Sequence, residues 1–230
     1  MKKLLLLGIT LFLIHSASAQ FFLGGGHLNG SSSIGKLRED VRGFFYPSVS
    51  GFLLYEFETN PLQIGVDFGY GIYGTDLEKR TDLFAGSNDE LRLRRNNNII
   101  TGMLVMRYLP LLNTKYTPFI EAQFGGNYLY TRYKIRATID EEAFEAGTEH
   151  TQWALAYRFG AGVQFPADWW DQNIKFEIKT TYQSSNEIQF LTRGDVIYLP
   201  DEGVFDYQLQ RGQLQFLTFS VGIIVYDLFY

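Results

Sequence analysis

The stretch that decides the fold is LQIGVDFGYGIY, residues 62–73. From Leu62 to Ile72, every even position is large and apolar, whereas the odd positions are polar or small: Gln63, Gly65, Asp67, Gly69 and Gly71. Side chains alternate between the two faces of a β-strand, so this stretch has one apolar and one polar face. About ten such residues in a tilted strand cross the hydrocarbon layer of a membrane. The stretch therefore predicts a membrane-spanning β-strand.

The same alternation recurs in runs that are separated by turn signals. We expect eight strands, at residues 21–34, 44–57, 62–74, 96–109, 118–136, 152–165, 174–190 and 213–226. Short connections alternate with long, charged ones at residues 75–95, 137–151 and 191–212, whereas the connection at 35–43 is intermediate. This asymmetry is typical of outer-membrane barrels. The sequence therefore predicts an all-β fold: an eight-stranded antiparallel up-and-down transmembrane β-barrel with long extracellular loops.

The apolar faces of these runs carry no charge within the predicted spans. On two of the runs, the residues expected to face outward are Ile100, Leu104, Met106, Tyr108, Trp153, Leu155, Tyr157, Phe159, Val163 and Phe165. A lipid-facing Lys or Arg near the membrane midplane costs about 2–4 kcal/mol, which explains the absence of charge. The alternative is a soluble sandwich or lipocalin-like barrel, with the apolar faces turned inward. The opposite faces are rich in Gly, Ser and Ala, which suits a narrow interior and favours the membrane barrel.

The first 19 residues have the pattern of a secretion signal. Lys2 and Lys3 precede an apolar run at residues 4–14, and small residues follow at 17–19. This order of a charged start, an apolar run and a small-residue cleavage site marks a cleaved signal peptide. We expect cleavage after Ala19, export, and a single barrel domain over residues 20–230. The expected location is the outer membrane of a Gram-negative bacterium.

The overall composition excludes several classes of partner and chemistry. The formal net charge is −5, and removal of the signal would remove two lysines and no acid, so we expect no nucleic-acid partner. The chain has no cysteine, which excludes disulfides, thiolate metal sites and cysteine nucleophiles. We expect no cofactor. The acids at 140–149 lack the spacing of a dedicated calcium loop, so we expect no metal site there.

The polar faces of the predicted strands carry four bases and four acids. They are Glu56, Asp67, Arg107, Glu121, Arg158, Lys175, Glu177 and Lys179. If the hairpin at 110–118 pairs positions whose numbers sum to 228, Arg107 lies directly opposite Glu121. Unpaired buried charge is costly, so this balance predicts a paired lumenal charge network. An eight-stranded barrel is narrow enough to be filled by side chains, which favours a plug over the alternative of a gate or narrow polar path.

A second group of charges continues the outward faces beyond the apolar band. The group consists of Arg92, Arg94, Arg132, Lys134 and Arg136. The same hairpin register places Arg94 opposite Lys134, and Arg92 opposite Arg136. Arginines bind phosphate bidentately, so these cations are candidates for binding lipopolysaccharide in the outer leaflet. The alternative is a solvated hairpin whose bases pair with the acids at 140–149, and a single bulge would turn the group inward.

Several motifs resemble the small eight-stranded outer-membrane barrel family of the OmpA, OmpX and OmpW type, in the form common among Bacteroidota. They are the glycine-rich residues 21–29 and the segments 65–71, 107–110, 118–122, 160–163 and 229–230. The terminal aromatics Phe229 and Tyr230 resemble the signal read by the barrel-assembly machinery, which implies that machinery as a partner during biogenesis. The resemblance specifies architecture more than function. Other envelope proteins are candidate partners of the loops.

Three classes of function fit such a barrel. We expect a structural or interaction protein that acts through its loops, through lipopolysaccharide, or as an accessory subunit of a membrane complex. The alternative is a porin-like channel for small solutes. A lipid A-modifying enzyme fits less well, because the expected mature chain has only His27 and His150, and neither stands in a His-x-Ser pattern. The apolar loop residues Val196, Ile197, Tyr198, Leu199 and Phe205 are expected either to form a partner surface or to pack over the barrel mouth.

Overall fold

The computed structural model describes residues 21–40, 45–57, 60–83, 89–111, 114–138, 141–167, 173–192, 194–199 and 204–226. The expected signal peptide at 1–19 lies outside these residues, as do Asp140 and the terminal aromatics Phe229 and Tyr230. Within the described ranges, no helix is long and apolar enough to span a membrane.

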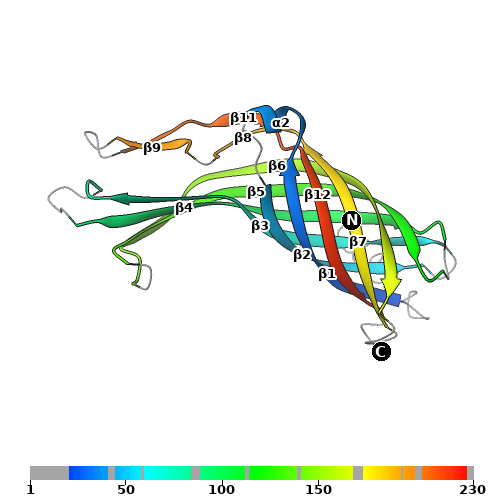
Figure 1. The fold of residues 1–230 in the computed structure, drawn as a ribbon. Coiled ribbons are helices and arrows are strands. Elements are labelled where there is room, and N and C mark those ends of the chain that lie inside the picture. The colour runs from blue at the N-terminus through cyan, green and yellow to red at the C-terminus, as the bar shows by residue number, and fades with distance from the viewer. Residues whose placement is uncertain are drawn as a thin grey trace, which may run out of the picture.

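Eight antiparallel strands form a closed barrel (Figure 1). They are β1 (Phe21–Ser33), β2 (Phe45–Glu56), β3 (Leu62–Arg80), β4 (Leu91–Tyr108), β5 (Thr117–Arg136), β6 (Glu145–Pro166), β7 (Ile174–Ser185) and β12 (Phe216–Val225). Consecutive strands of the wall pair with each other, and β1 pairs with β12 to close the ring. The predicted eight-stranded up-and-down barrel is confirmed.

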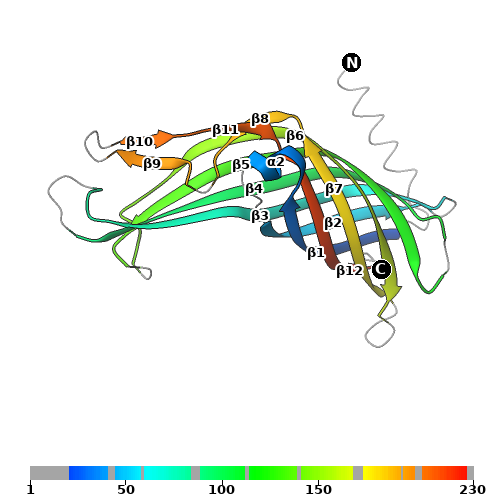
Figure 2. The same ribbon diagram turned by 45° about the horizontal axis from the view of Figure 1, so that its top comes forward.

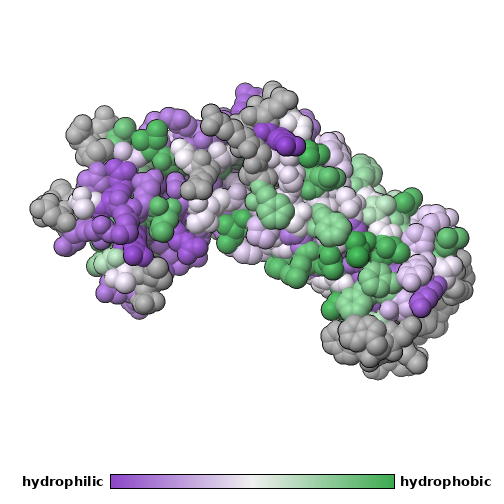
Figure 3. All heavy atoms as spheres, in the orientation of Figure 1, coloured by the Kyte–Doolittle hydropathy of each residue, from purple (hydrophilic) through white to green (hydrophobic). Residues whose placement is uncertain are grey.

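The barrel turns its apolar faces outward. Leu104 and Trp153 are 64% and 69% exposed, whereas Val105, the neighbour of Leu104 on β4, is 3% exposed. The exposed apolar side chains form a band over the barrel half of the molecule (Figure 3). A soluble barrel buries its apolar faces, so this inverted arrangement is that of a barrel whose wall contacts lipid.

Four strands of the wall continue far beyond the barrel, on the side away from the start of β1 and the end of β12 (Figure 1). We call this part the extension; it consists of residues 74–80 of β3, 91–97 of β4, 131–136 of β5 and 145–150 of β6. The expected loops at 75–95 and 137–151 were therefore too long. Hydrogen bonding between the strands continues here, although the outward face is no longer apolar.

A β-bulge marks each edge of the extension where it leaves the barrel. The pairing of β3 with β4 skips Tyr73, and the pairing of β6 with β5 skips Glu149. Bulges bend a strand and increase its twist. The β4–β5 pairing runs through the same level without a shift, so the outward faces of these two strands keep their alternation.

The connections at the far end of the barrel contain short elements of their own. A short helix, α2 (Gly35–Asp40), follows β1. The connection between β7 and β12 forms two two-stranded sheets, β8 (Glu187–Phe190) with β11 (Gln210–Gln213) and the hairpin of β9 (Val196–Leu199) with β10 (Val204–Tyr207). They run as a ribbon alongside the extension (Figures 1 and 2). The strand expected at 174–190 is wrong beyond Ser185, because β8 leaves the wall and pairs with β11.

Candidate functional site

Arg107 lies at the centre of the lumen and is fully buried. The register places it directly opposite Glu121, as the expected sum of 228 requires. Its Nη2 donates to Oε2 of Glu121 at 2.6 Å, and its Nη1 donates to Oε2 of Glu177 at 2.8 Å. A guanidinium has five donors in a planar fork, so one arginine can bind two carboxylates that approach from different strands.

Lys179 and His27 complete this group. Nζ of Lys179 donates to Oε1 of Glu121 at 3.1 Å, and Nε2 of His27 lies 2.9 Å from Oε1 of Glu177. We call these five residues the lumenal cluster: His27, Arg107, Glu121, Glu177 and Lys179. With a neutral histidine, the cluster contains two positive and two negative charges. This balance satisfies the requirement that buried charges be paired and hydrogen-bonded.

A glycine allows His27 to reach Glu177. His27 lies opposite Gly222 on β12, which in turn lies opposite Glu177 on β7. A Cβ atom at Gly222 would clash with Cδ2 of His27 and with the backbone oxygen of Gly26, so any other side chain would displace the imidazole and the neighbouring strand. The absence of a side chain on the intervening strand therefore joins two strands that are not neighbours.

Aromatic rings cover two members of the lumenal cluster, Arg107 and His27. The guanidinium of Arg107 lies 4.0 Å from the centre of the Phe119 ring, and the His27 ring stacks on Phe52 with centres 4.7 Å apart. Stacking of a planar cation on an aromatic face stabilises the charge without a hydrogen-bond acceptor. The cluster is held by carboxylates on its edges and by rings on its faces.

The other charges of the predicted network lie around the lumenal cluster and have partners of their own. Nη1 of Arg158 is 3.8 Å from Oδ1 of Asp67, and Nε of Arg158 donates to Gln183 at 2.6 Å. Near the termini, Nζ of Lys175 lies 3.2 Å from the Tyr226 hydroxyl. Separately, Glu56 accepts a hydrogen bond from Nε2 of Gln63 at 2.6 Å. Nη1 of Arg158 also donates to Oε1 of Gln123 at 3.3 Å, and the Tyr226 hydroxyl donates to Oε1 of Gln164 at 2.9 Å. Because Gln123 and Gln164 donate in turn to Glu121 and Glu177, neutral side chains connect these charges to the lumenal cluster.

Sequence reasoning that counts only charges misses the neutral members of the site. Gln123 donates to Glu121 at 2.7 Å, and Gln164 donates to Glu177 at 3.2 Å. The predicted charge network leaves out His27, yet Nε2 of His27 lies 2.9 Å from Oε1 of Glu177. All three face inward by the same alternation that locates Arg107, so the inward polar positions as a whole were the available signal.

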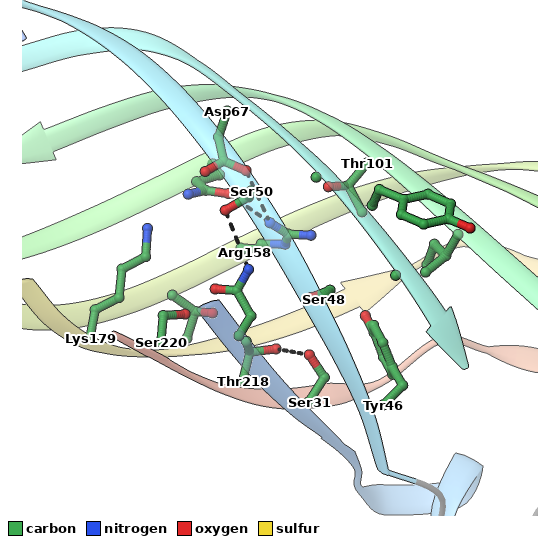
Figure 4. A pocket seen from close by; sticks show the side chains of 17 residues that line it. Ser31, Tyr46, Ser48, Ser50, Asp67, Thr101, Arg158, Lys179, Thr218 and Ser220 are labelled. Carbon is green, nitrogen blue, oxygen red and sulfur yellow. Dashed lines mark hydrogen bonds and ion pairs between the residues drawn. The ribbon is translucent and has the colours of Figure 1, made fainter. Parts of the chain in front are cut away.

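Apolar clusters lie on both sides of the lumenal cluster. Toward the termini, Leu23, Phe52, Leu54, Val105 and Ile224 pack together. The far end is closed by a larger set, which we call the cap: Leu37, Tyr46, Ile99, Leu129, Ala154, Ile188, Phe190, Leu214 and Phe216. Between the cap and the lumenal cluster lies a small polar chamber with a volume of about 20 Å³ (Figure 4).

The predicted basic group lies together on the outward face of the extension. Arg94 is opposite Lys134, and Arg92 is opposite Arg136. Arg132 is opposite Asn96 and lies nearer the barrel than these two pairs. All five cations line one groove of about 120 Å³, which we call the basic groove. Leu77, Asn96 and Thr138 complete its lining. Because the bulges are on β3 and β6, the cations on β4 and β5 remain outward.

The acidic residues nearest in sequence to the basic groove that have partners contact residues outside it. Within the part of the chain that the structure describes, Arg92, Arg94, Arg132 and Lys134 form no ion pair with a carboxylate. The acids of the 141–149 segment that have partners point away from the groove: Glu145 accepts from the Tyr133 hydroxyl at 2.6 Å, and Glu149 pairs with Arg95 at 3.1 Å. The hydrogen bond to Glu145 raises the pKa of Tyr133 to about 12.

The opposite face of the extension is covered. Leu91, Leu93 and Ile135 form a buried core against which Phe205 of β10 packs. The Phe205 ring also lies 4.5 Å from the guanidinium carbon of Arg95. Of the apolar residues expected at the mouth or in a partner surface, Val196 and Tyr198 are buried, whereas Ile197 and Leu199 are exposed. This hairpin covers the extension, and the cap closes the mouth.

Neither described histidine has the surroundings of a catalytic base. His27 belongs to the lumenal cluster, and Nε2 of His150 lies 3.2 Å from the backbone oxygen of Gln189. In the described ranges, no group of three or more His, Asp or Glu residues is placed to hold a metal ion. The charged side chains are paired inside the barrel, whereas the cations of the basic groove are exposed on the outer face of the extension.

No family model and no curated protein matches the sequence. Several solved structures of outer-membrane proteins are similar in architecture. Neisserial surface protein A has 10% identity and a TM-score of 0.41, over 90% of this chain and 99% of that one. A major outer membrane protein from Thermus thermophilus has 11% identity and a TM-score of 0.45, over 88% and 99%. The N-terminal barrel domain of Pseudomonas aeruginosa OprF has 12% identity and a TM-score of 0.38, over 88% of this chain and 96% of that one.

Proposed function

We propose that this chain is an integral outer-membrane β-barrel protein of a Gram-negative bacterium, and that it acts as a structural and interaction protein and not as an enzyme. Its extension is then extracellular, and the chain termini are periplasmic. The barrel-assembly machinery is the proposed partner during biogenesis, and other envelope proteins are proposed partners of the loops. The apolar outer surface of the barrel supports this location.

The packing of the lumen supports a barrel that solutes do not pass through. Arg107 is buried and bound by two carboxylates, and apolar clusters lie on both sides of it. A path for hydrated solutes would need a continuous polar route past these groups. We therefore propose that the interior supports the wall, and that the surface outside the membrane carries the function.

The arrangement of cations in the basic groove supports the binding of an anionic ligand. Like charges directly opposite each other in a sheet are destabilising, yet Arg94 faces Lys134 and Arg92 faces Arg136. An anion placed between such pairs removes the repulsion, and arginine binds phosphate oxygens bidentately. The groove also contains the apolar side chain of Leu77, which suits a ligand with both phosphate and apolar parts. We propose the phosphorylated headgroup of lipopolysaccharide.

The position of the groove along the strands agrees with this ligand. Tyr128 lies 4.8 Å from Trp153, ring centre to ring centre, and 5.7 Å from Tyr130 in the same way. Such aromatic side chains mark the interface between lipid and water. Arg132 follows Tyr128 by four residues, which is about 13 Å along a strand. The cations therefore begin at the level where headgroup phosphates lie.

The experiment is to purify the barrel in mild detergent from membranes that contain lipopolysaccharide and to measure retained lipopolysaccharide per barrel. We expect Arg94→Glu with Lys134→Glu to lower retention severalfold, because the pairs then repel phosphate. Lys115→Glu with Arg211→Glu changes the net charge equally at exposed sites away from the groove and should retain the wild-type amount. Equal retention by both variants would remove lipopolysaccharide from the proposal.

A further inference from the structure

The outward side chains of the extension form three rows across β3, β4 and β5. From the far end toward the barrel, the rows are Lys79, Arg92 and Arg136; then Leu77, Arg94 and Lys134; and then Thr75, Asn96 and Arg132. We call the first of these the distal row and the last the proximal row. They are four residues apart, which is about 13 Å along a strand. The cations of the basic groove are therefore spread along it and not gathered at one point.

A single phosphate group does not match this spread of charge. A phosphate monoester carries about −1.5 to −2 charges at neutral pH, whereas five cations line the groove. Charge-assisted hydrogen bonds are about 2.7–2.9 Å long, so an anion bound in the proximal row is too far away to contact the distal row. Arg92 and Arg136 would still face each other with no anion between them. Two phosphates, with about −3 to −4 charges in total, match the groove better.

The proximal row contains a neutral donor that is held in place, the side-chain amide of Asn96. Its Oδ1 accepts hydrogen bonds from Oγ1 of Thr75 at 3.2 Å and from Nε of Arg94 at 3.2 Å. Thr75 lies on one side of Asn96, and Arg132 lies on the other. The amide NH₂ group is therefore turned toward Arg132, and the guanidinium of Arg94 is drawn toward the proximal row. These three side chains present N–H donors to the groove, which is the composition of an anion site.

The distal row supplies a second set of donors. Arg92 and Arg136 lie directly opposite each other, and Thr138 adds a hydroxyl group to the lining of the groove. Lys79, at the edge of this row, already pairs with Glu90 at 2.5 Å. Lys134 lies on β5 between the two rows. The two arginines are therefore the main donors of the distal row.

We propose that the basic groove binds two phosphate groups at once, one in each row, and that it selects glycolipid headgroups with a phosphate at each end of a disaccharide. This inference rests on the proposed binding of lipopolysaccharide and adds a specificity to it. The groove, at about 120 Å³, is smaller than the roughly 300–1,000 Å³ of a site that encloses a small molecule. The phosphates therefore enter it, and the sugars lie across its mouth. A pyrophosphate, whose two phosphorus atoms share one oxygen, is too short to span the rows.

The test is native mass spectrometry of the barrel in detergent, freed of lipopolysaccharide, with purified lipid A as the probe. The probe carries either both phosphates or only one. We expect the bisphosphorylated form to bind at least about tenfold more tightly, because its second phosphate binds as an intramolecular step. Asn96→Asp places a carboxylate beside Arg94 and Arg132 and should lower this ratio to about one. Asn186→Asp makes the same exchange at an exposed site outside the groove and should keep the wild-type ratio.

A second variant tests the other row. Arg92→Gln with Arg136→Gln removes the distal cations without adding an acid, and it should also lower the ratio to about one. Because the readout is a ratio within one variant, a loss of folded protein does not change it. The inference is overturned if the wild-type barrel binds both phosphorylated forms equally, or if Asn96→Asp keeps the ratio. Equally tight binding of lipid A without any phosphate would overturn the proposed phosphate recognition as well.

Discussion

The barrel and the extension are built from the same strands, yet they place charge on opposite faces. In the barrel, Arg107 of β4 points inward and is bound by carboxylates, while Leu104 points outward. In the extension, Leu93 of the same strand points inward and is buried, while Arg94 points outward and has no described carboxylate partner. The alternation continues along the strand, and the medium outside it changes.

This difference shows how the surrounding medium, lipid or water, limits where charged side chains can lie. Against lipid, the outward face must be apolar, so the charges of the barrel are confined to the lumen and must be paired. Against water, the outward face can carry cations, and the inward face of the extension acquires an apolar core of its own. Paired charge therefore marks the supporting interior, and unpaired cations mark the surface that can bind a ligand.

Two arginines on β4 give the largest contrast. We expect Arg107→Leu to destabilise the barrel by about 3–5 kcal/mol, because it leaves Glu121 and Glu177 buried without their main cation. Arg94→Leu removes an exposed cation and should change the free energy of unfolding by less than about 0.5 kcal/mol. Urea unfolding in detergent measures both. Similar losses for the two variants would mean that the paired and unpaired arginines are not distinct.

Placing a lysine on the outward face at two heights tests the boundary of the lipid layer. Leu104→Lys puts the charge in the apolar band and should cost about 2–4 kcal/mol in a bilayer. Asn96→Lys adds the same charge within the basic groove, directly opposite Arg132, and should cost at most about 1 kcal/mol. Unfolding in phospholipid vesicles is the measurement. Equal cost at both positions would place residue 96 inside the membrane.

The hairpin on the inner face of the extension supplies a smaller effect. Phe205→Ala removes the ring that packs on Arg95 and on the apolar core, a contact of about 0.5–2 kcal/mol. We expect faster proteolysis of the connection at 191–212, with the barrel unchanged. Val204→Ala alters the exposed neighbour and is the control. Unchanged proteolysis of Phe205→Ala would mean that the hairpin is held by other contacts.

The smallest expected effect is a titration. The hydrogen bond to Glu145 raises the pKa of Tyr133 to about 12, so Glu145→Gln should return it toward the usual value near 10. Because the pKa of the folded state is the higher one, the associated stability is present below about pH 10 and is lost as the pH rises toward 12. Ultraviolet difference absorbance of phenolate measures this. A titration curve that the substitution leaves unchanged would exclude the contact.

Much of the barrel follows from the sequence, because a period of two leaves little freedom once one face must meet lipid. The pair of Arg107 with Glu121 and the outward set that includes Arg94 required only this alternation and one turn. The predicted strand at 118–136 includes the β5 part of the extension, but the β3, β4 and β6 parts were missed. The apolar alternation stops at the barrel, whereas hydrogen bonding continues to Arg80 and resumes at Leu91. The periodicity of one segment does not indicate that strand pairing continues beyond the apolar alternation.

The contacts between distant strands were beyond sequence reasoning. His27 meets Glu177 only because β12 lies between their strands with Gly222 at the crossing. The cap likewise depends on where α2 and β8 settle, and both are too short to show a period. These contacts are decided by the closure of the barrel and by packing, neither of which can be read from one segment.

The most direct test is a ladder of single spin-labelled cysteines along β4 in lipid bilayers, with oxygen and a water-soluble nickel complex as collision reagents. At Ile100 and Leu104, labels should collide with oxygen, and at Arg92 and Arg94 with nickel. At Leu93, Ile99 and Val105, they should be protected from both. A loss of the two-residue period between Arg94 and Ile100, or nickel access at Ile99, would contradict the claim that one continuous strand carries lipid-facing and ligand-facing residues on the same side.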